Sequence, residues 1–360
     1  MKHVDIAVIG GGPAGLCAAI SGASSGAKVL LMDRNEKLGG QLIKQTHMFF
    51  GSEKQYASVR GFDITYILLD KLNEYKDNVE IMNNTNVLGL YEDDVITIER
   101  NEKYEKIKPK SIVVATGASE KVLAFPNNDL PGIYGAGAVQ TLMNVYGIKP
   151  GKRVLMVGAG NIGLIVSYQL MQAGVEIAAI IDASPTIGGY LVHASKIRRM
   201  GVPILTSHTV KEAIGKDCLE SVVIWKLDEN WNPIDGTEKE IKTDVMCISV
   251  GLSPLSELLQ QAECKMKYIP ELGGQTVLRN ENYETSVEGI YVAGDVSGVE
   301  EASSAMVEGY LAGLCAAKKI GYTHKNYNEL KEDYIKQLES LRSGPIGHHI
   351  RSGIEKVMGV

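Results

Sequence analysis

The sequence predicts an α/β protein built from two Rossmann-like, three-layer dinucleotide-binding domains, one of them inserted in the other. The first observation is a glycine-rich motif that occurs twice, as IAVIGGGPAG at residues 6–15 and as VLMVGAGNIG at residues 154–163. The second is that a short apolar run precedes each motif and a longer apolar run follows it, which is the order strand, turn, helix. The third is an aspartate at the end of the next strand in each copy, Asp33 and Asp182.

The first glycine motif has the residue types that binding a diphosphate requires. Residues 4–9 form an apolar run that we expect to be a strand buried on both faces. Gly10 permits a tight turn, Gly12 lets a diphosphate approach the backbone, and Gly15 lets the helix pack closely on the strand. The start of the helix then offers free N–H groups and a partial positive charge. We therefore expect a dinucleotide to contact Gly10, Gly12, Pro13, Ala14, Gly15 and Asp33.

The second glycine motif repeats this pattern. Residues 153–157 are the expected strand, and Asp182 lies 19 residues after Gly163, close to where an acid bonds a ribose 2′-hydroxyl. A carboxylate there accepts hydrogen bonds from the hydroxyl and repels a 2′-phosphate, so the pattern favours NADH over NADPH. The residues expected to contact NAD(H) are Gly158, Gly160, Asn161, Ile162, Gly163, Asp182 and Gly251.

Two complete dinucleotide-binding units imply two bound dinucleotides. A redox reaction within one chain requires that the two differ, and FAD with NAD(H) is the simplest pair. The alternative of another class is a binding module that retains FAD as a structural element. Reduction of the flavin by NADH distinguishes the enzyme from the binding module.

Two further segments complete a recognisable series. SIVVATG at residues 111–117 and TSVEGIYVAGD at residues 285–295 each indicate a buried strand that ends in a small-residue turn. In this order and spacing, GGGPAG, ATG, GAGNIG and TSVEGIYVAGD resemble the pyridine nucleotide–disulfide oxidoreductase superfamily, and the total spacing is similar to that of thioredoxin reductases. The resemblance implies a discontinuous FAD domain of residues 1–118 and 253–322, an NAD domain of residues 125–250, and a C-terminal helical extension of residues 323–360.

The resemblance also implies how the later segments bind FAD. Asp295 matches the Gly-Asp aspartate of the superfamily and is expected to bond a ribityl hydroxyl, since a carboxylate accepts such bonds readily. A helix over residues 302–319 is expected to aim its N-terminus at the flavin, where its partial positive charge stabilises negative charge. The further FAD contacts implied in this way are Ala115, Thr116, Gly117, Gly294, Asp295 and Ala302.

The redox-active cysteine pair of the superfamily is missing from this sequence. The segment GGQLIKQTH at residues 39–47 has no cysteine, and Cys218 and Cys247 are 29 positions apart instead of forming a CxxC motif. Without a vicinal thiol pair, electrons cannot leave through a disulfide relay. The sequence therefore predicts that the protein is not a disulfide reductase.

The same segment supplies the candidates for residues beside the flavin ring. By matching position, Gly40, Gln41 and Thr46 are expected to run along the isoalloxazine. Lys44 is a candidate catalytic residue that would stabilise negative charge on the flavin, and His47 is one that would bond the ring or a substrate. For each of them, the role of an ordinary loop residue is the alternative.

Relatives that lack the cysteine pair indicate where the electrons go. Residues 130–163 look most like subunits of the sarcosine oxidase alpha, hydrogen cyanide synthase and dye-linked proline or opine dehydrogenase type. This resemblance implies hydride exchange between NAD(H) and flavin in an electron-transfer or dehydrogenase component for amine or amino-acid oxidation, and its partner would be a second flavoprotein subunit. The alternative is a thioredoxin-reductase-like ferredoxin or flavodoxin–NAD(P) reductase.

Composition narrows the remaining classes. The formal net charge is −6 and no long basic run occurs, so no nucleic-acid partner is expected. No apolar stretch reaches the roughly 18 residues of a membrane span. The five scattered cysteines are typical of reduced thiols in a cytoplasmic protein and not of a metal site. The resemblance implies a homodimer or a hetero-oligomer.

The C-terminal extension is predicted to contain an amphipathic helix over residues 326–341, because its apolar residues fall on one stripe. Packing or a dimer contact is the simpler role for this tail. The alternative is that the following segment, SGPIGHHIRSG, covers the flavin or docks a partner through His348 or His349.

Overall fold

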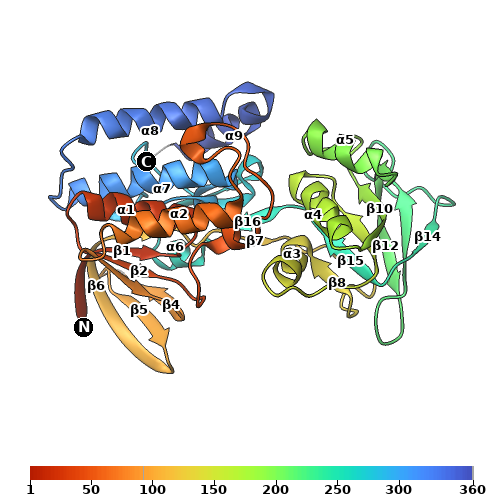
Figure 1. Cartoon of the computed structure of the whole chain (residues 1–360), viewed down its shortest axis with the longest axis horizontal. Helices are drawn as coiled ribbons and strands as arrows, with labels where there is room; N and C mark the ends of the chain where they lie inside the picture. The colour runs from red at the N-terminus through yellow and green to blue at the C-terminus, as the bar shows by residue number, and fades with distance from the viewer. Residues whose placement is uncertain (92, 359–360) are drawn as a thin grey trace. The chain divides into compact units, whose positions relative to one another are not determined.

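The computed structural model describes residues 1–91 and 93–358, which divide into two compact units (Figure 1). Unit 1 contains residues 1–119 and 252–360, and unit 2, residues 120–251, is inserted between these two parts. Each unit is built on a sheet with a parallel centre and covering helices, so the predicted fold class is confirmed.

The large sheet of unit 1 is parallel at its centre. β1 (Lys2–Ile9) lies between β2 (Val29–Met32) and β6 (Lys103–Val114), and both neighbours run parallel to it. β3 (Val79–Met82) extends the sheet beyond β2, and β19 (Ile290–Val292) pairs with the end of β6. The carboxyl ends of these parallel strands meet at one edge, which is where such sheets bind ligands.

β6 is one long strand where the sequence predicts two. Separate strands were expected at residues 104–107 and 111–117, but the structure has 12 continuous residues that end at Val114. The first half pairs antiparallel with β5 (Ile96–Arg100), and the second half pairs parallel with β1 and β19. Because each half has its own partners, the strand stays continuous. β4 (Thr85–Leu90) completes the sheet beside β5.

The two central helices of unit 1, α1 (Pro13–Ser24) and α7 (Ala302–Lys319), pack against each other at very short range. A Cβ built on Gly309 or on Gly313 of α7 would lie only 2.1 or 2.2 Å from a carbonyl oxygen of α1. Glycine at both positions is therefore what allows the helices to touch. α2 (Gly61–Asn73) packs beside α1.

Unit 2 contains a five-stranded parallel sheet in the order β11-β10-β9-β15-β8. Its β9 (Arg153–Val157) matches the predicted strand after which the second glycine motif follows. The other elements are β8 (Ile133–Gly135), α3 (Ala136–Asn144), α4 (Asn161–Gln172), β10 (Glu176–Asp182), α5 (Leu191–Arg199), β11 (Ile204–Thr206) and β15 (Val245–Ile248), with an antiparallel sheet of β12 (His208–Ile214), β13 (Ser221–Lys226) and β14 (Lys239–Lys242).

Shorter elements complete the chain. β7 (Ala118–Glu120) and β16 (Leu252–Pro254), where the chain passes from one unit to the other, pair with each other. The remaining elements are α6 (Glu257–Gln261), the hairpin of β17 (Met266–Ile269) and β18 (Gly274–Val277), and the 3₁₀ turns η1 (Gly40–Lys44), η2 (Glu53–Gln55), η3 (Pro270–Leu272) and η4 (Asp295–Ser297).

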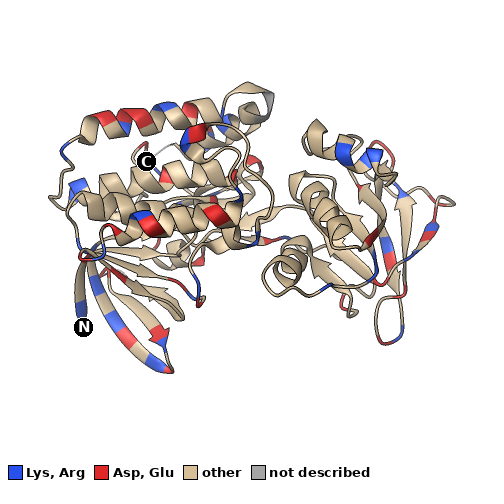
Figure 2. Ribbon diagram, viewed as in Figure 1, with Lys and Arg blue, Asp and Glu red and all other residues tan. Residues whose placement is uncertain are grey.

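The C-terminal extension contains the predicted helix and a second one. α8 (Tyr327–Leu341) agrees with the helix expected over residues 326–341, and it lies along α7 (Figure 1). Acidic and basic residues are interspersed along α8 (Figure 2). The apolar stripe of α8 is therefore turned toward unit 1, and its charged residues toward water.

α9 (Gly344–Val357) was not predicted, because its glycines favour a loop. It is stabilised by tertiary contacts instead of by propensity, since Ile350, Ile354 and Val357 pack against Ile269 and Leu272. No helix within the described residues is long and apolar enough to cross a membrane.

Candidate functional site

The glycine turn after β1 requires glycine for two different reasons. Gly10 has a φ of +104°, and a Cβ there would lie 2.3 Å from the carbonyl oxygen of Ala115. A Cβ on Gly15 would lie 1.7 Å from the carbonyl oxygen of Gly10. Around Gly12, in contrast, the nearest atom would be 3.8 Å from an added Cβ, the Cα of Gly40. The missing side chain of Gly12 therefore leaves open space in front of the backbone.

The start of α1 has the features of an anion site. Gly12 is the N-cap residue, Pro13 occupies the first turn, and no side chain caps the helix. Two other glycines approach it: a Cβ on Gly40 would lie 2.7 Å from the Cα of Gly12, and one on Gly294 would lie 2.9 Å from the Cβ of Ala14. Three separate segments thus form a cradle that side chains would fill, and a dinucleotide diphosphate fits this arrangement.

Asp33 faces the turn from the end of β2. Its Oδ2 accepts a hydrogen bond from the N–H of Gly11 at 2.6 Å, and its Oδ1 accepts one from the N–H of Asn35 at 2.7 Å. A carboxylate oxygen accepts more than one hydrogen bond, so the fixed side chain retains the capacity to bind a ribose hydroxyl. The N–H of Gly39 donates to the carbonyl oxygen of Gly11 at 2.8 Å, which ties the Gly-Gly loop to the same turn.

The 115–117 turn follows β6 at the same edge of the sheet. Ala115 is buried, and its carbonyl oxygen faces the glycine turn. The hydroxyl of Thr116 donates to the carbonyl oxygen of Leu255 at 2.8 Å, and the N–H of Leu255 donates back to Gly117 at 2.9 Å. Gly117 has a φ of +77°. These residues shape the wall of the cradle through their backbone.

Asp295 lies between the turn at Gly294 and the start of α7. Gly294 has φ +77° and ψ −159°, a conformation that suits glycine. The N–H of Glu300 donates to Oδ1 of Asp295 at 3.3 Å. Burial, together with the carboxylates of Glu308 and its neighbours, raises the pKa of Asp295 to about 7. α7 begins at Ala302 without a side-chain cap, so its first-turn N–H groups are available to a ligand.

Residues 39–47 form an ordered loop. The ring of His47 stacks on that of Phe49, with 5.9 Å between centroids and 14° between planes. The guanidinium of Arg60 donates to the carbonyl oxygen of Thr46. Gln41 is exposed, whereas Lys44, Thr46 and His47 are half-buried. The catalytic roles of the lysine and the histidine stay predictions.

Unit 2 repeats the geometry of the first glycine turn. Gly158 has a φ of +111°, and a Cβ there would lie 2.1 Å from the carbonyl oxygen of Ser249. A Cβ on Gly163 would also lie 2.1 Å from a carbonyl oxygen, that of Gly158. Around Gly160 nothing lies within 4 Å of an added Cβ, and no side chain caps α4. The second cradle therefore has the same close approach and the same open space.

Asp182 holds the place in unit 2 that Asp33 has in unit 1. Its Oδ2 accepts from the N–H of Ala159 at 2.6 Å, and its Oδ1 accepts from the N–H of Ser184 at 2.8 Å. The first lysine or arginine after it is Lys196, whose ammonium lies over the ring of Tyr168 at 4.5 Å. This lysine is thus engaged on the surface of α4.

A second Gly-Gly loop, at Gly188–Gly189, was not anticipated from the sequence. The N–H of Gly189 donates to the carbonyl oxygen of Ala159 at 2.9 Å, and a Cβ on Gly189 would lie 2.9 Å from the carbonyl carbon of Gly160. The pair begins six residues after Asp182, and the pair at residues 39–40 begins six residues after its own aspartate. This duplicated spacing was the signal that identifies the loop.

The remaining residues predicted for the nicotinamide nucleotide have different surroundings. Oδ1 of Asn161 accepts from the N–H of Tyr190 at 2.8 Å, which joins the start of α4 to the second Gly-Gly loop. Ile162 is exposed on α4. Gly251 has a φ of +114° beyond the end of β15, and it accepts from the N–H of Lys121 at 2.9 Å.

All five cysteines are free, and only Cys218 is exposed. Burial raises the pKa of the Cys17 thiol to about 12 and also raises that of Cys247. Such thiols are poor nucleophiles, because the thiolate is the reactive form. Among the described residues, no three His, Cys, Asp or Glu side chains are placed to hold a metal ion.

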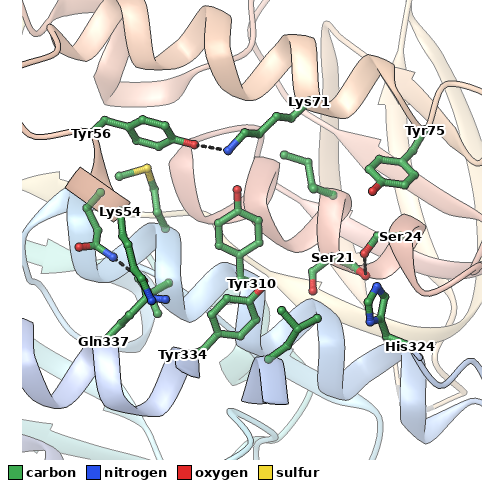
Figure 3. Close-up of a pocket in the computed structure, with 15 residues that line it drawn as sticks. Ser21, Ser24, Lys54, Tyr56, Lys71, Tyr75, Tyr310, His324, Tyr334 and Gln337 are labelled. Atoms are coloured by element: carbon green, nitrogen blue, oxygen red, sulfur yellow. Dashed lines mark hydrogen bonds between the residues drawn. The ribbon is translucent and has the colours of Figure 1, made fainter. Parts of the chain in front are cut away.

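A separate cavity of about 410 Å³ lies among α1, α2, α7 and α8 (Figure 3). Its upper side is closed by Lys71, which donates to the hydroxyl of Tyr56 at 2.7 Å. Tyr310 of α7 and Tyr334 of α8 stack inside it, with 5.5 Å between ring centroids. None of the glycine-turn residues lines this cavity, so it is distinct from the two cradles.

Two curated proteins show how far the similarity extends along the chain. The alpha subunit of sarcosine oxidase from Corynebacterium sp. (strain P-1) is 27% identical over 337 residues, which cover 89% of this chain and 33% of that protein. A subunit of the opine oxidase from Agrobacterium tumefaciens (strain Ach5) is 26% identical over 359 residues, covering 94% of this chain and 70% of that one. The chain therefore spans about a third of the length of the sarcosine oxidase relative. Both relatives are named as subunits of an enzyme.

A solved structure agrees with these relatives. L-proline dehydrogenase from P. horikoshii has a TM-score of 0.69 and 25% sequence identity, and the match covers 94% of this chain and 58% of that chain. The family model described as pyridine nucleotide-disulphide oxidoreductase matches residues 4–309. Members of this family are oxidoreductases that bind FAD and pyridine nucleotides, which agrees with the paired cradles. The predicted resemblance is confirmed, and the chain belongs to the pyridine nucleotide-disulphide oxidoreductase family.

Proposed function

We propose that the protein is an FAD-dependent oxidoreductase that exchanges hydride between NAD(H) and FAD, as an electron-transfer or dehydrogenase component in the oxidation of amines or amino acids. The observation that carries this proposal is the duplicated cradle. Two uncapped helix N-termini, at Gly12 and Gly160, each face open space, and each has a fixed aspartate nearby. One nucleotide would need only one such cradle.

Unit 1 is the proposed FAD site. The diphosphate would bind at the start of α1, Asp33 would accept a ribose hydroxyl, and Asp295 would bond the ribityl chain. The uncapped start of α7 would place partial positive charge near the flavin. FAD supplies reversible two-electron chemistry when it is bound. The protein's part is to hold it, to keep water out and to tune the charge around it.

Unit 2 is the proposed NAD(H) site. The diphosphate would bind at Gly160 and the start of α4, and Asp182 would accept the ribose 2′-hydroxyl. Because the carboxylate is held at 2.6 Å by the N–H of Ala159, it stays beside the turn, where it would repel a 2′-phosphate. NADPH is therefore the less favoured nucleotide.

The route by which electrons leave is proposed from the cysteines and the relatives. A disulfide relay needs a vicinal thiol pair, and four of the five thiols are buried. The relatives are named as subunits of sarcosine oxidase and opine oxidase. We therefore place the donor on a second, flavin-containing subunit that oxidises an amine or amino acid, in a hetero-oligomer.

Anaerobic mixing of the purified, FAD-loaded protein with NADH tests this function. We expect the visible absorbance of the flavin to bleach, and to bleach more slowly with NADPH. A protein that retains neither FAD nor NADH contradicts the proposal. Retention of FAD without bleaching supports a binding module, and rapid re-oxidation by ferredoxin or flavodoxin supports the alternative reductase.

A further inference from the structure

A buried cluster of charged side chains joins the C-terminal extension to the turn that carries Asp295. We call Glu300, Glu308 and Arg342, with Tyr283, the arginine clasp. Arg342 is the residue that ends α8, and it is 8% exposed, while Glu308 of α7 is 2% exposed. A guanidinium from the extension is therefore placed inside unit 1.

Glu308 links the clasp to the turn. Its Oε2 accepts from the N–H of Gly294 at 2.8 Å and from the hydroxyl of Ser297 at 3.0 Å. Its Oε1 accepts from the hydroxyl of Tyr283 at 2.9 Å and from the guanidinium of Arg342. One carboxylate thus holds the turn with one oxygen and the extension with the other.

Glu300 provides the second attachment. Arg342 donates to it through two nitrogens, from Nε to Oε2 at 3.0 Å and from Nη2 to Oε1 at 2.7 Å. The N–H of Glu300 in turn donates to Asp295, and α7 begins two residues later at Ala302. Arg342 therefore fastens both ends of the segment from residue 294 to residue 300.

The charge balance of the clasp depends on the extension. Two carboxylates are buried here, and a buried carboxylate that loses its cation is strongly destabilised. Arg279 is the other guanidinium beside the clasp, but it approaches Glu308 only to 3.9 Å and lies over the ring of Tyr283. Arg342 thus provides the short, two-pronged contact that compensates both carboxylates.

We infer that Arg342 is a positioning residue of the flavin site, which makes the C-terminal extension part of that site. It holds the Gly294–Glu300 turn in the shape that presents Asp295 and the start of α7 to FAD, and it balances the carboxylates behind them. The inference rests on the proposed function of unit 1. It differs from the predicted roles of the tail, because neither His348 nor His349 takes part.

The test compares Arg342→Gln, which loses the charge, with Arg342→Lys, which keeps it without the fork. The matched control is Lys336→Gln, which removes an exposed cation of the same helix, paired with Glu332. Three quantities are measured on the full chain: the Kd of the apoprotein for FAD by quenching of flavin fluorescence, the reduction potential of the bound flavin, and the Tm of the apoprotein.

For Arg342→Gln we expect the Kd for FAD to rise by about tenfold or more, because a two-pronged, charge-assisted contact is lost. The reduction potential should become more negative, since uncompensated carboxylates disfavour the added charge of the reduced cofactor. Arg342→Lys should recover part of both effects, and Lys336→Gln should behave as wild type. If Arg342→Gln does not fold, the double variant Glu300→Gln, Arg342→Gln takes its place, because it removes one of the carboxylates left without a cation.

Unchanged Kd and potential in variants that only lower Tm would overturn the inference, and the extension would then be a structural strap. A wild-type protein that does not bind FAD would instead refute the proposed function, and the inference with it.

Discussion

At the scale of single residues, aspartates decide how the two cradles would recognise a ribose. Asp33 and Asp182 each accept a backbone N–H at 2.6 Å, from Gly11 and Ala159 respectively. These N–H groups belong to the glycine turns themselves, so the carboxylates are oriented before a nucleotide arrives. Such preorganisation lowers the entropic cost of binding.

Replacing Asp182 with serine should remove the preference for NADH. A hydroxyl bonds a ribose more weakly than a carboxylate and no longer repels a 2′-phosphate, so the Kd for NADH should rise about tenfold and approach that for NADPH. The measurement is binding of both reduced nucleotides by their fluorescence. Asp33→Ser is the matched control, which should weaken FAD binding and leave the NADH to NADPH ratio unchanged. A ratio that stays the same in Asp182→Ser contradicts the assignment.

Asp295 predicts a pH dependence of the apoprotein. Its pKa is raised from the ordinary value of 3.8 to about 7, by burial first and by neighbouring carboxylates. The folded apoprotein therefore binds this proton more tightly than the unfolded chain does. The stability that this proton contributes is fully present below about pH 4 and is lost as the pH rises through about 7.

Asp295→Asn removes this titration. The Tm of the apo variant relative to that of apo wild type should therefore increase between about pH 5 and about pH 8, corresponding to at most about 4 kcal/mol. Thermal unfolding monitored by circular dichroism across this range gives the comparison. A difference in Tm that does not change with pH shows that Asp295 does not titrate in this range.

At the scale of elements, α1 and α4 depend on glycine in two ways. Gly15 and Gly163 lie where any Cβ would meet a carbonyl oxygen, at 1.7 and 2.1 Å, so they serve helix–strand packing. Gly12 and Gly160 have no such neighbour, and their backbones at φ −75° and −74° are open to any residue. The fold does not require glycine at these two N-caps, whereas the approach of a phosphate does.

Valine at the two N-caps should separate the nucleotides. Gly12→Val should abolish detectable FAD binding and leave NADH binding intact, while Gly160→Val should do the reverse, because each side chain occupies the space of one diphosphate. Each variant is the control for the other, and both should fold with a Tm close to that of wild type. Loss of both nucleotides in either variant would show that the cradles are not independent.

Gly163→Ala is the contrasting variant. Its Cβ would overlap the carbonyl oxygen of Gly158, so it should destabilise the protein by about 1–3 kcal/mol. Denaturant unfolding measures the loss. A stable Gly163→Ala protein would mean that the turn relaxes more easily than its geometry indicates.

At the scale of the whole molecule, the proposed function requires a partner. The chain covers 33% of the sarcosine oxidase relative and 70% of the opine oxidase relative, both named as subunits. Among the residues that the structure describes, neither cradle contains a convincing acid–base pair for amine oxidation. The oxidative step therefore belongs, in this proposal, to another polypeptide.

Purification of the full chain as its native complex should yield a second flavoprotein in stoichiometric amount. Its FAD or FMN content, measured after separating the chains, should exceed what unit 1 alone accounts for. Isolation with a ferredoxin or flavodoxin would instead favour the alternative reductase. A homodimer that oxidises no amine or amino acid and binds no other chain would contradict the proposal of a multi-subunit enzyme.

Much of the fold follows from local pattern. β9 and α7 agree with the predicted ranges, because continuous apolar runs bounded by glycine or aspartate have one compatible structure in each case. The two glycine motifs and their aspartates lie where the spacing placed them. Their nucleotide contacts stay predictions, since a backbone cradle shows what fits and not what is bound.

The rest depended on contacts between residues distant in sequence. β6 is continuous because its two halves pair with different strands, and α9 forms because three apolar residues find a buried surface around Leu272. Arg342 has no motif around it, and its role follows only from the carboxylates that α7 places beside it. The sequence alone determined the duplicated cradles, since glycine spacing acts on the nearby backbone. Only the tertiary structure decided that the C-terminal tail reaches the Asp295 turn, because the charges of that cluster come from segments that meet only after folding.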